Sequence, residues 1–217
     1  MAQIVRYHIW ESQLANQDIT DKIVVRNLQA AANAGIDAWG RKREQPILVT
    51  VSVSLGQSFS SAAIADSLDN STIHYGILSK KIRSAINSIP PQDHLQTDAL
   101  AMLIDDEVRQ VAGKTPLAST EVDIFYPKAS RYGDGAGFRY SISYLHAPFS
   151  MVLYLQNLRV DCIIGINSNE KIQKQPVVVN LWVDAVRSGR ADDYTRIESV
   201  VVEVGIFSEC KTETDCV

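Results

Sequence analysis

The sequence predicts an α+β fold: an antiparallel β-sheet carries a pair of helices on one face, and a partial second copy of the unit follows. Two observations lead to this prediction. Apolar periodicity and chain breakers give the order β-β-α-α-β-β over residues 21–145. Residues 21–53 also align without a gap with residues 151–183, at a constant offset of 130. A repeat of this length indicates one supersecondary unit used twice.

The repeat depends on dipeptides that return with their separations unchanged. They are Asn27-Leu28 and Asn157-Leu158, Gly35-Ile36 and Gly165-Ile166, and Gln45-Pro46 and Gln175-Pro176. The alternative is chance similarity between two hydrophobic hairpins. The constant separation of all three dipeptides favours duplication.

Each element of the first copy follows from a local pattern. Residues 21–28 and 47–55 are apolar and rich in β-branched side chains, which predicts two strands on either side of a turn at Gly35. From His74 the apolar period becomes helical, and Pro90-Pro91 ends this first helix. The apolar face of the first predicted helix consists of Leu78, Ile82, Ala85 and Ile86.

The second helix and the following hairpin complete the first copy. The helix ends at Gly113, with Leu100, Leu103, Ile104, Val108 and Val111 on its buried side. Strand alternation returns over residues 120–127 and 138–145, which predicts a hairpin.

Outside the first copy, the patterns are weaker. Residues 146–150 are expected to form a linker, and residues 197–206 one more strand, so the second copy has no room for the helix pair. The predicted domains are an N-terminal, loosely attached arm (1–20), a complete first unit (21–145), a partial second repeat (151–206) and a polar tail (207–217). A sheet that ends in such a partial copy leaves an open edge, which predicts an oligomer.

Composition excludes several classes of function. The chain has 217 residues, of which 46% are hydrophobic and 21% charged, as in an ordinary globular protein. A net charge of −4 gives no reason to expect a nucleic acid or an anionic membrane as partner. Residues 1–20 contain Arg6, His8, Glu11 and Asp18 and therefore no apolar signal region. Three cysteines are too few for a disulfide framework or a zinc site. These features predict a reduced, cytoplasmic protein.

Generic motifs give no site. The glycines of Gly133-Asp134-Gly135-Ala136-Gly137 superficially resemble a phosphate-binding loop, but a strand follows them where a helix is needed, so a β-turn or bulge is expected. The four histidines are scattered, and no metal is predicted.

Five stretches taken together resemble the dihydroneopterin aldolase family. In order they are Asn27-Leu28 to Gln45-Pro46, Ser71-Thr72-Ile73-His74-Tyr75-Gly76, Asp98-Ala99-Leu100-Ala101, Tyr126-Pro127-Lys128-Ala129 and Asp134-Gly135-Ala136-Gly137. The whole chain is similar to the tandem aldolase region of fungal folate-synthesis proteins, with the second copy truncated. The resemblance implies a β-β-α-α-β-β subunit, rings of subunits, and pterin sites between neighbours.

The resemblance also implies a chemistry. The family cleaves 7,8-dihydroneopterin by a retro-aldol reaction that releases glycolaldehyde, with epimerisation as a side activity. The pterin ring is the electron sink, so no cofactor is expected. The protein must hold the pterin edge with a carboxylate and move protons with a positioned acid or base.

Several family positions are matched. Tyr75 corresponds to the tyrosine donated across the subunit interface, with Thr72 and Ile73 beside it, and Asp98 corresponds to the pterin-anchoring glutamate, with Thr97 before it. The alternatives are a half-buried aromatic residue at a helix start for Tyr75, and a first-turn residue favoured by the helix dipole for Asp98.

Other positions depart from the family. Tyr126 stands where the family has a lysine, and Gly40 where it has an acidic residue, whereas the same count in the second copy reaches Glu170. Lys128 lies two residues beyond Tyr126, so in an extended strand the two would share a face and Lys128 would supply the missing ammonium. The alternative is a solvated lysine in a turn. Glu170 is the second possible repair, reaching a composite site.

Three functions therefore stay open. The first is an aldehyde-lyase or epimerase acting on a 7,8-dihydropterin in folate biosynthesis, with a degenerate site. The second is a catalytically silent pterin-binding or assembly subunit. The third is a repurposed catalyst for another bicyclic substrate, with Tyr126 as proton donor. In each case the expected partners are a small pterin-like molecule and further copies of the chain, not nucleic acid or membrane.

Overall fold

The computed structural model describes residues 3–15, 21–58, 72–144, 148–164, 167 and 169–207. Its first-copy elements are β1 (Lys22–Ala32), β2 (Gln45–Leu55), α3 (Tyr75–Asn87), α4 (Thr97–Ala112), β3 (Leu117–Tyr126) and β4 (Gly135–Ser143). They are preceded by α1 (Tyr7–Ala15) and followed by β5 (Phe149–Cys162), the 3-10 turn η1 (Glu170–Ile172), β6 (Gln175–Val183) and α5 (Tyr194–Phe207).

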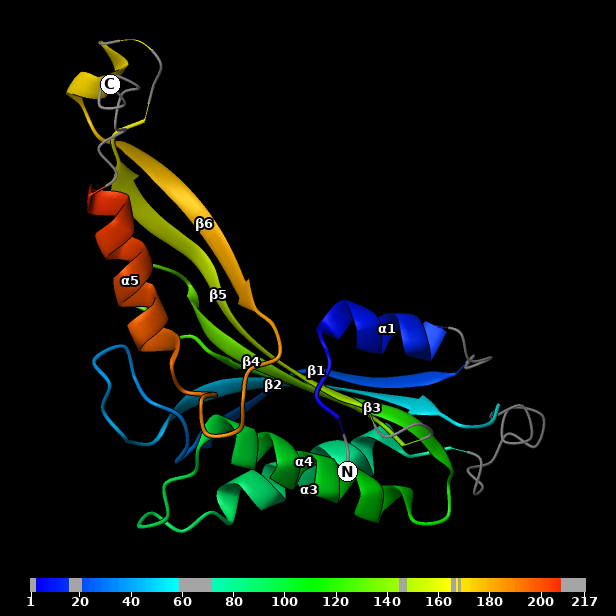
Figure 1. Ribbon diagram of the computed structural model, residues 1–217. Coiled ribbons are helices and arrows are strands. Elements are labelled where there is room, and N and C mark those ends of the chain that lie inside the picture. The colour runs from blue at the N-terminus through cyan, green and yellow to red at the C-terminus, as the bar shows by residue number, and fades with distance from the viewer. Residues whose placement is uncertain are drawn as a thin grey trace.

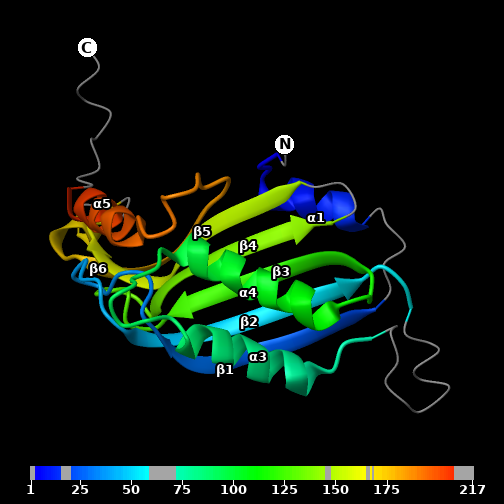
Figure 2. The same cartoon turned by 90° about the horizontal axis from the view of Figure 1, so that it is seen from below.

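The six strands form one antiparallel sheet in the order β1-β2-β3-β4-β5-β6. Helices α3 and α4 cover one face, and α1 lies on the other (Figures 1 and 2). The predicted α+β class and the helix pair on one face are confirmed.

The core lies between the sheet and the helix pair, where the predicted apolar faces are found. Leu78, Ile82, Ala85 and Ile86 of α3 are all buried, as are Leu100, Ile104 and Val108 of α4. Spacings of three and four residues place such side chains on one side of a helix. The core therefore fixes the N-terminus of α4 over the sheet, where the candidate site lies.

The two copies of the hairpin have the same backbone geometry. Asn27 and Asn157 both have a left-handed backbone, with φ 50° and 51°, and each sits at a register shift in its strand. The N–H of Asn27 donates to Thr50 Oγ1 at 3.1 Å, and that of Asn157 donates to Asn180 Oδ1 at 2.9 Å. Asparagine tolerates this conformation better than most residues, so the repeated asparagine marks a repeated β-bulge.

The Gln-Pro pairs also have a structural role. The side-chain amide of Gln45 donates to the carbonyl of Ala34 at 3.0 Å, and that of Gln175 donates to Ile164 at 3.1 Å. Both bonds close the connection between the two strands of a hairpin. Motifs that carry the family resemblance are therefore partly fold determinants.

The sheet passes from the first copy into the second without a break, because β4 pairs with β5. The strand predicted over residues 197–206 is wrong, since this segment belongs to helix α5. Tyr194, Glu198 and Val202 are buried at helical spacing, and their packing outweighs the β preference of the valines. Up to residue 207, where the described part of the chain ends, the second copy thus has one helix after its hairpin.

Two other expectations differ from the structure. The arm predicted as loosely attached contains α1, whose Trp10 is buried and which packs against β4 and β5. The linker predicted at 146–150 is shorter, because β5 begins at Phe149. Most of the predicted polar tail lies outside the described residues.

Candidate site between the two copies

The predicted site residues fall into two separate groups. Thr97, Asp98 and Tyr126 meet where the N-terminus of α4 packs over the end of β3, and all three are buried. Thr72, Ile73 and Tyr75 lie at the start of α3, beside the outer strand β1.

Tyr126 is fully buried and engaged in a hydrogen-bonded chain. Its hydroxyl lies 3.0 Å from Thr97 Oγ1, which donates its own proton to Asp192 Oδ1 at 2.5 Å. Because the single hydroxyl proton of Thr97 goes to Asp192, the hydroxyl of Tyr126 is the donor to Thr97. Burial raises the pKa of Tyr126 above its ordinary value, so the phenol stays protonated at neutral pH.

Asp192 belongs to the second copy and caps a helix of the first. Gln96, the N-cap of α4, makes no side-chain capping bond, and Asp192 Oδ1 accepts from the backbone N–H of Thr97 at 3.3 Å. A carboxylate is favourable at a helix N-terminus. Burial nevertheless raises the pKa of Asp192, against the lowering effect of the bonds from Thr97.

Tyr194, the first residue of α5, was missed by the sequence analysis. Its ring is 1% exposed and stacks on Tyr126 with centroids 6.1 Å apart. Its hydroxyl accepts from the N–H of Ile36 and donates to the carbonyl of the same residue, both at 2.6 Å. The available signal was Asp192-Asp193 before Tyr194, an acidic pair typical of a helix start.

Gly35 leaves the space that the two phenols fill. It has φ 66°, and a Cβ atom there would lie 2.8 Å from Tyr126 Cζ and 3.0 Å from the hydroxyl oxygen of Tyr194. The predicted turn glycine is therefore required both by backbone conformation and by close packing.

Asp98 is bound by the chain itself. Its Oδ2 accepts from Ser188 Oγ at 3.0 Å and from the N–H of Gly189 at 2.8 Å, and its Oδ1 accepts from the N–H of Ala99 at 2.9 Å. Both oxygens of the carboxylate at the family's anchoring position are thus engaged. The loop that engages them connects β6 with α5.

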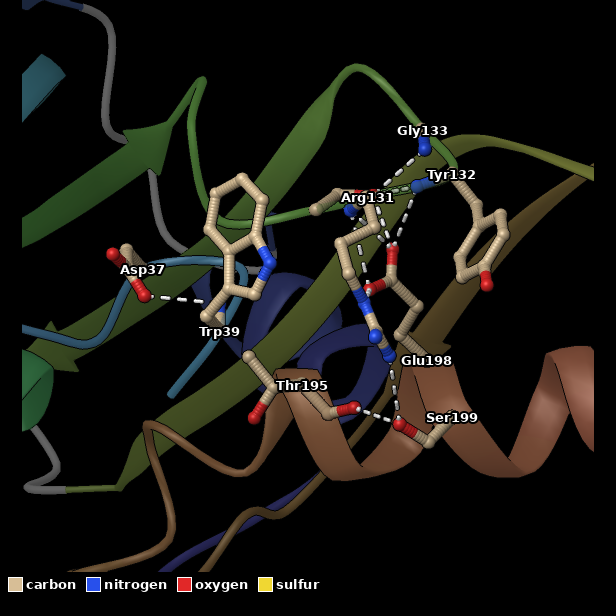
Figure 3. Close-up of polar contacts among 9 residues, drawn as sticks. Asp37, Trp39, Arg131, Tyr132, Gly133, Thr195, Glu198 and Ser199 are labelled. Carbon is tan, nitrogen blue, oxygen red and sulfur yellow. Dashed lines mark hydrogen bonds and ion pairs between the residues drawn. The ribbon is translucent and has the colours of Figure 1, made fainter. Parts of the chain in front are cut away.

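Helix α5 is held to the first copy by Glu198, a fully buried carboxylate (Figure 3). It accepts from the hydroxyl of Ser130 and from the backbone N–H groups of Arg131 and Tyr132, at 3.1–3.3 Å for the backbone donors. The Arg131 guanidinium lies 3.8 Å away. Charge-assisted hydrogen bonds of this kind fix α5, and with it Tyr194, over the end of β3.

The second group is open. Tyr75 is 68% exposed, and together with Thr72 and Ile73 it lines a surface cavity of about 410 Å³ beside Lys22, Ile23 and Val24. Tyr75 and Tyr194 occupy the same place in their copies, as the first residue of the helix after the hairpin.

The prediction that Tyr126 and Lys128 share a face is wrong. β3 ends at Tyr126, and Pro127-Lys128 form a turn in which the Lys128 carbonyl accepts from the N–H of Ala38 at 3.0 Å. Lys128 is exposed, whereas Tyr126 is buried. The geometric reason for Lys128 to replace the family's lysine is therefore removed.

The other two departures lie in hairpin connections. Gly40 has φ 75°, and nothing lies within 4 Å of the place of a Cβ atom. Glu170 begins the 3-10 turn between β5 and β6, and its predicted catalytic role stays a prediction.

A buried carboxylate, Asp37, organises the first connection. It accepts from the backbone N–H groups of Trp39 and Arg41, at 2.9 and 3.0 Å, and pairs with the guanidinium groups of Arg41 and Arg43 (Figure 3 shows the bond to Trp39). Burial raises the pKa of Asp37, but the bonds from Arg41 and Trp39 outweigh it, so the pKa lies below its ordinary value.

Neither a metal site nor a membrane-spanning helix is found in the described ranges. No three His, Cys, Asp or Glu side chains there gather closely enough to hold a metal ion. None of the helices in that part of the chain has the length and apolarity to cross a membrane.

The chain is similar in sequence to the folic acid synthesis protein of Schizosaccharomyces pombe, with 29% identity over 206 residues. The match covers 87% of this chain and 27% of the relative, so the chain spans about a quarter of that protein's length. The predicted resemblance is confirmed. No family model matches the chain.

Solved structures of dihydroneopterin aldolases are also similar to the chain. The Escherichia coli enzyme in complex with neopterin has a TM-score of 0.45 and 12% identity, covering 56% of this chain and 98% of its own. The enzyme of Burkholderia thailendensis bound to guanine has a TM-score of 0.42 and 15% identity, covering 62% and 98%.

Proposed function

We propose that this chain is a pterin-binding and assembly subunit of the dihydroneopterin aldolase type in folate or pteridine metabolism, without retro-aldol turnover of its own. The observation that carries the proposal is the state of Asp98. Its Oδ2 accepts two hydrogen bonds from the chain's own loop, so the carboxylate that would hold a pterin edge is already engaged.

The positions where the family has its acid and base groups support the same conclusion. Tyr126 stands where the family has a lysine, donates its proton to Thr97, and has a raised pKa. A phenol held in this way is a poor base at neutral pH. Gly40 has no side chain to replace the second acidic group.

The open cavity at Tyr75 supports the assembly role. In the family the equivalent tyrosine serves a site in the neighbouring subunit. Within this chain, Tyr194 of the second copy already lies against Tyr126 of the first. We infer that Tyr75 is presented in the same way to another aldolase-type subunit, which supplies the carboxylate and lysine that this chain lacks.

A second candidate is slow retro-aldol cleavage or epimerisation of a 7,8-dihydropterin. It is favoured by the retention of the Asp98 carboxylate and by the exposure of Ser188 and Gly189, the residues that cover it. This function requires the covering loop to move, as pterin binding at Asp98 does, and it also requires an acid or base in place of the missing lysine.

One assay separates the candidates. Purified chain is mixed with 7,8-dihydroneopterin, and glycolaldehyde release is measured beside a no-protein control and the Asp98→Asn variant, while neopterin binding is followed by fluorescence. Under the proposal, we expect saturable neopterin binding without glycolaldehyde release above the no-protein control. Release that disappears in Asp98→Asn would establish the second candidate, and neither binding nor release would favour a different bicyclic substrate.

A further inference from the structure

A short exposed loop lies between Asp98 and an apolar cavity on the helix-covered face of the sheet. The cavity has a volume of about 360 Å³, and its walls come from α4, β4, β5 and the N-terminal segment. Its lining residues are Ile4, Met102, Tyr140, Ile142, Phe149, Met151, Arg187 and Ser188. The volume lies in the range of small-ligand pockets, which begins at about 300 Å³.

Ser188 faces both Asp98 and the cavity. Its hydroxyl donates to Asp98 Oδ2, and the same residue lines the cavity wall. Met102, another wall residue, follows Asp98 by four positions on α4, so the two lie one helical turn apart on the same side. Moving the Ser188–Gly189 segment away from Asp98 would therefore join the carboxylate to the apolar cavity.

The loop is lightly attached. The N–H of Tyr7 donates to Asp184 Oδ1 at 3.1 Å, and the N–H of Val186 donates to the carbonyl of Met151 at 3.0 Å. Beyond Val186 the loop is held by the two bonds to Asp98 and by the contact of Asp192 with Thr97. Residues 187–190 are exposed, whereas Val186 and Ala191 on either side of them are buried in the core. A segment with few buried contacts opens at lower free energy than the core.

We propose that residues 187–190 form a lid held by Asp98, and that a flat heterocycle with an N–H edge displaces this lid and binds in the cavity beneath it. The lid places two donors on the Asp98 carboxylate, the hydroxyl of Ser188 and the N–H of Gly189, and the N–H edge of a guanine-like ring would supply two donors in their place. The apolar walls, with Tyr140 and Phe149, suit the faces of such a ring. This inference deepens the proposed function and rests on it for the identity of the ligand.

The attachment of the lid is tested first, without any ligand. Hydrogen exchange of the Gly189 amide is measured in the parent chain, in Asp98→Asn and in Asp106→Asn, a control with an exposed carboxylate on the same helix. The expected result is exchange about tenfold faster in Asp98→Asn alone, because the amide loses a charge-assisted bond. Unchanged exchange in Asp98→Asn would overturn the inference.

Ligand binding is then measured with neopterin as the probe. Gly189→Pro removes the N–H donor at a left-handed position (φ 81°), and Gly113→Pro does the same at a distant exposed glycine (φ 56°) that donates to the carbonyl of Arg109. Thermal unfolding checks that each variant folds. Ser188→Ala, which removes only the hydroxyl bond to Asp98, is a second and milder way to release the lid. We expect Gly189→Pro to bind neopterin about tenfold more tightly than the parent or Gly113→Pro, and Asp98→Asn to abolish the gain.

The outcomes separate this inference from the proposed function. Equal, measurable affinities in the parent, Gly189→Pro and Gly113→Pro would overturn the lid and leave the proposed function standing. No neopterin binding by any variant would overturn both. A gain that survives Asp98→Asn would contradict the role of the carboxylate.

Discussion

Tyr75 and Tyr194 begin the helix that follows each copy of the hairpin, yet one is 68% exposed and the other 1%. The hairpins before them share register, bulge and turn-closing glutamine. The difference is in the neighbour: Tyr194 lies over the first copy, whereas Tyr75 lies beside the outer strand β1. The exposure of this tyrosine therefore depends on the segment beside it, and at the junction of the two copies the chain's own side chains fill the space.

The largest expected effect is that of Tyr194→Ala. Removing a fully buried aromatic ring that packs on Tyr126 should lower the free energy of unfolding by about 3–5 kcal/mol. Tyr75→Ala, the matched change in the open copy, should lower it by less than about 0.5 kcal/mol. Urea unfolding followed by fluorescence measures both, and equal losses would break the comparison.

Glu198→Ala should have the next largest effect, because α5 loses the carboxylate that binds the backbone of Arg131 and Tyr132. Leaving these donors unpaired should cost about 2–3 kcal/mol of stability. Glu203→Ala, an exposed position on the same helix, is the control. If thermal unfolding gave the two variants the same midpoint, Glu198 would not be the anchor of α5.

A smaller, pH-dependent effect is expected for Asp37, whose counterpart in the second copy is Asn167. Because the pKa of Asp37 is lowered on folding, its carboxylate stabilises the fold above its unfolded pKa of about 4, and this stabilisation is lost as the pH falls through the folded value. Asp37→Asn should therefore cost about 1–3 kcal/mol at pH 7 and less at low pH. A stability difference between parent and Asp37→Asn that does not change with pH would contradict this account.

Much of the fold was predictable because it depends on local patterns. The offset of 130 identified the second hairpin, and Asn27 and Asn157 indeed have the same backbone conformation. The constant offset of 130 does not extend beyond the hairpin, because the connection from the hairpin to the next helix is shorter in the second copy. Tyr75 lies 22 residues after Val53, whereas Tyr194 lies 11 residues after Val183. The run of valines in α5 then favoured a strand locally, and only tertiary packing makes it helical.

The candidate site was predictable only in part. Thr97, Asp98 and Tyr126 come together as their motifs suggest, but Ser188, Gly189 and Asp192 belong to a connection with no motif. Lys128 was misplaced because its prediction assumed an extended strand through Pro127, whereas β3 ends at Tyr126. Contacts between the two copies depend on the path of the chain over the sheet, and the local periodicity of apolar residues carries no information about this path.

The junction between the two copies is closed by Tyr194 packed on Tyr126, whereas the equivalent surface at Tyr75 is open. Tyrosine nitration by tetranitromethane, read residue by residue by mass spectrometry, tests it most directly. We expect rapid nitration of Tyr75 in the folded protein, and nitration of Tyr126 and Tyr194 only after unfolding in urea. Nitration of Tyr194 in the folded chain as fast as that of Tyr75 would contradict it.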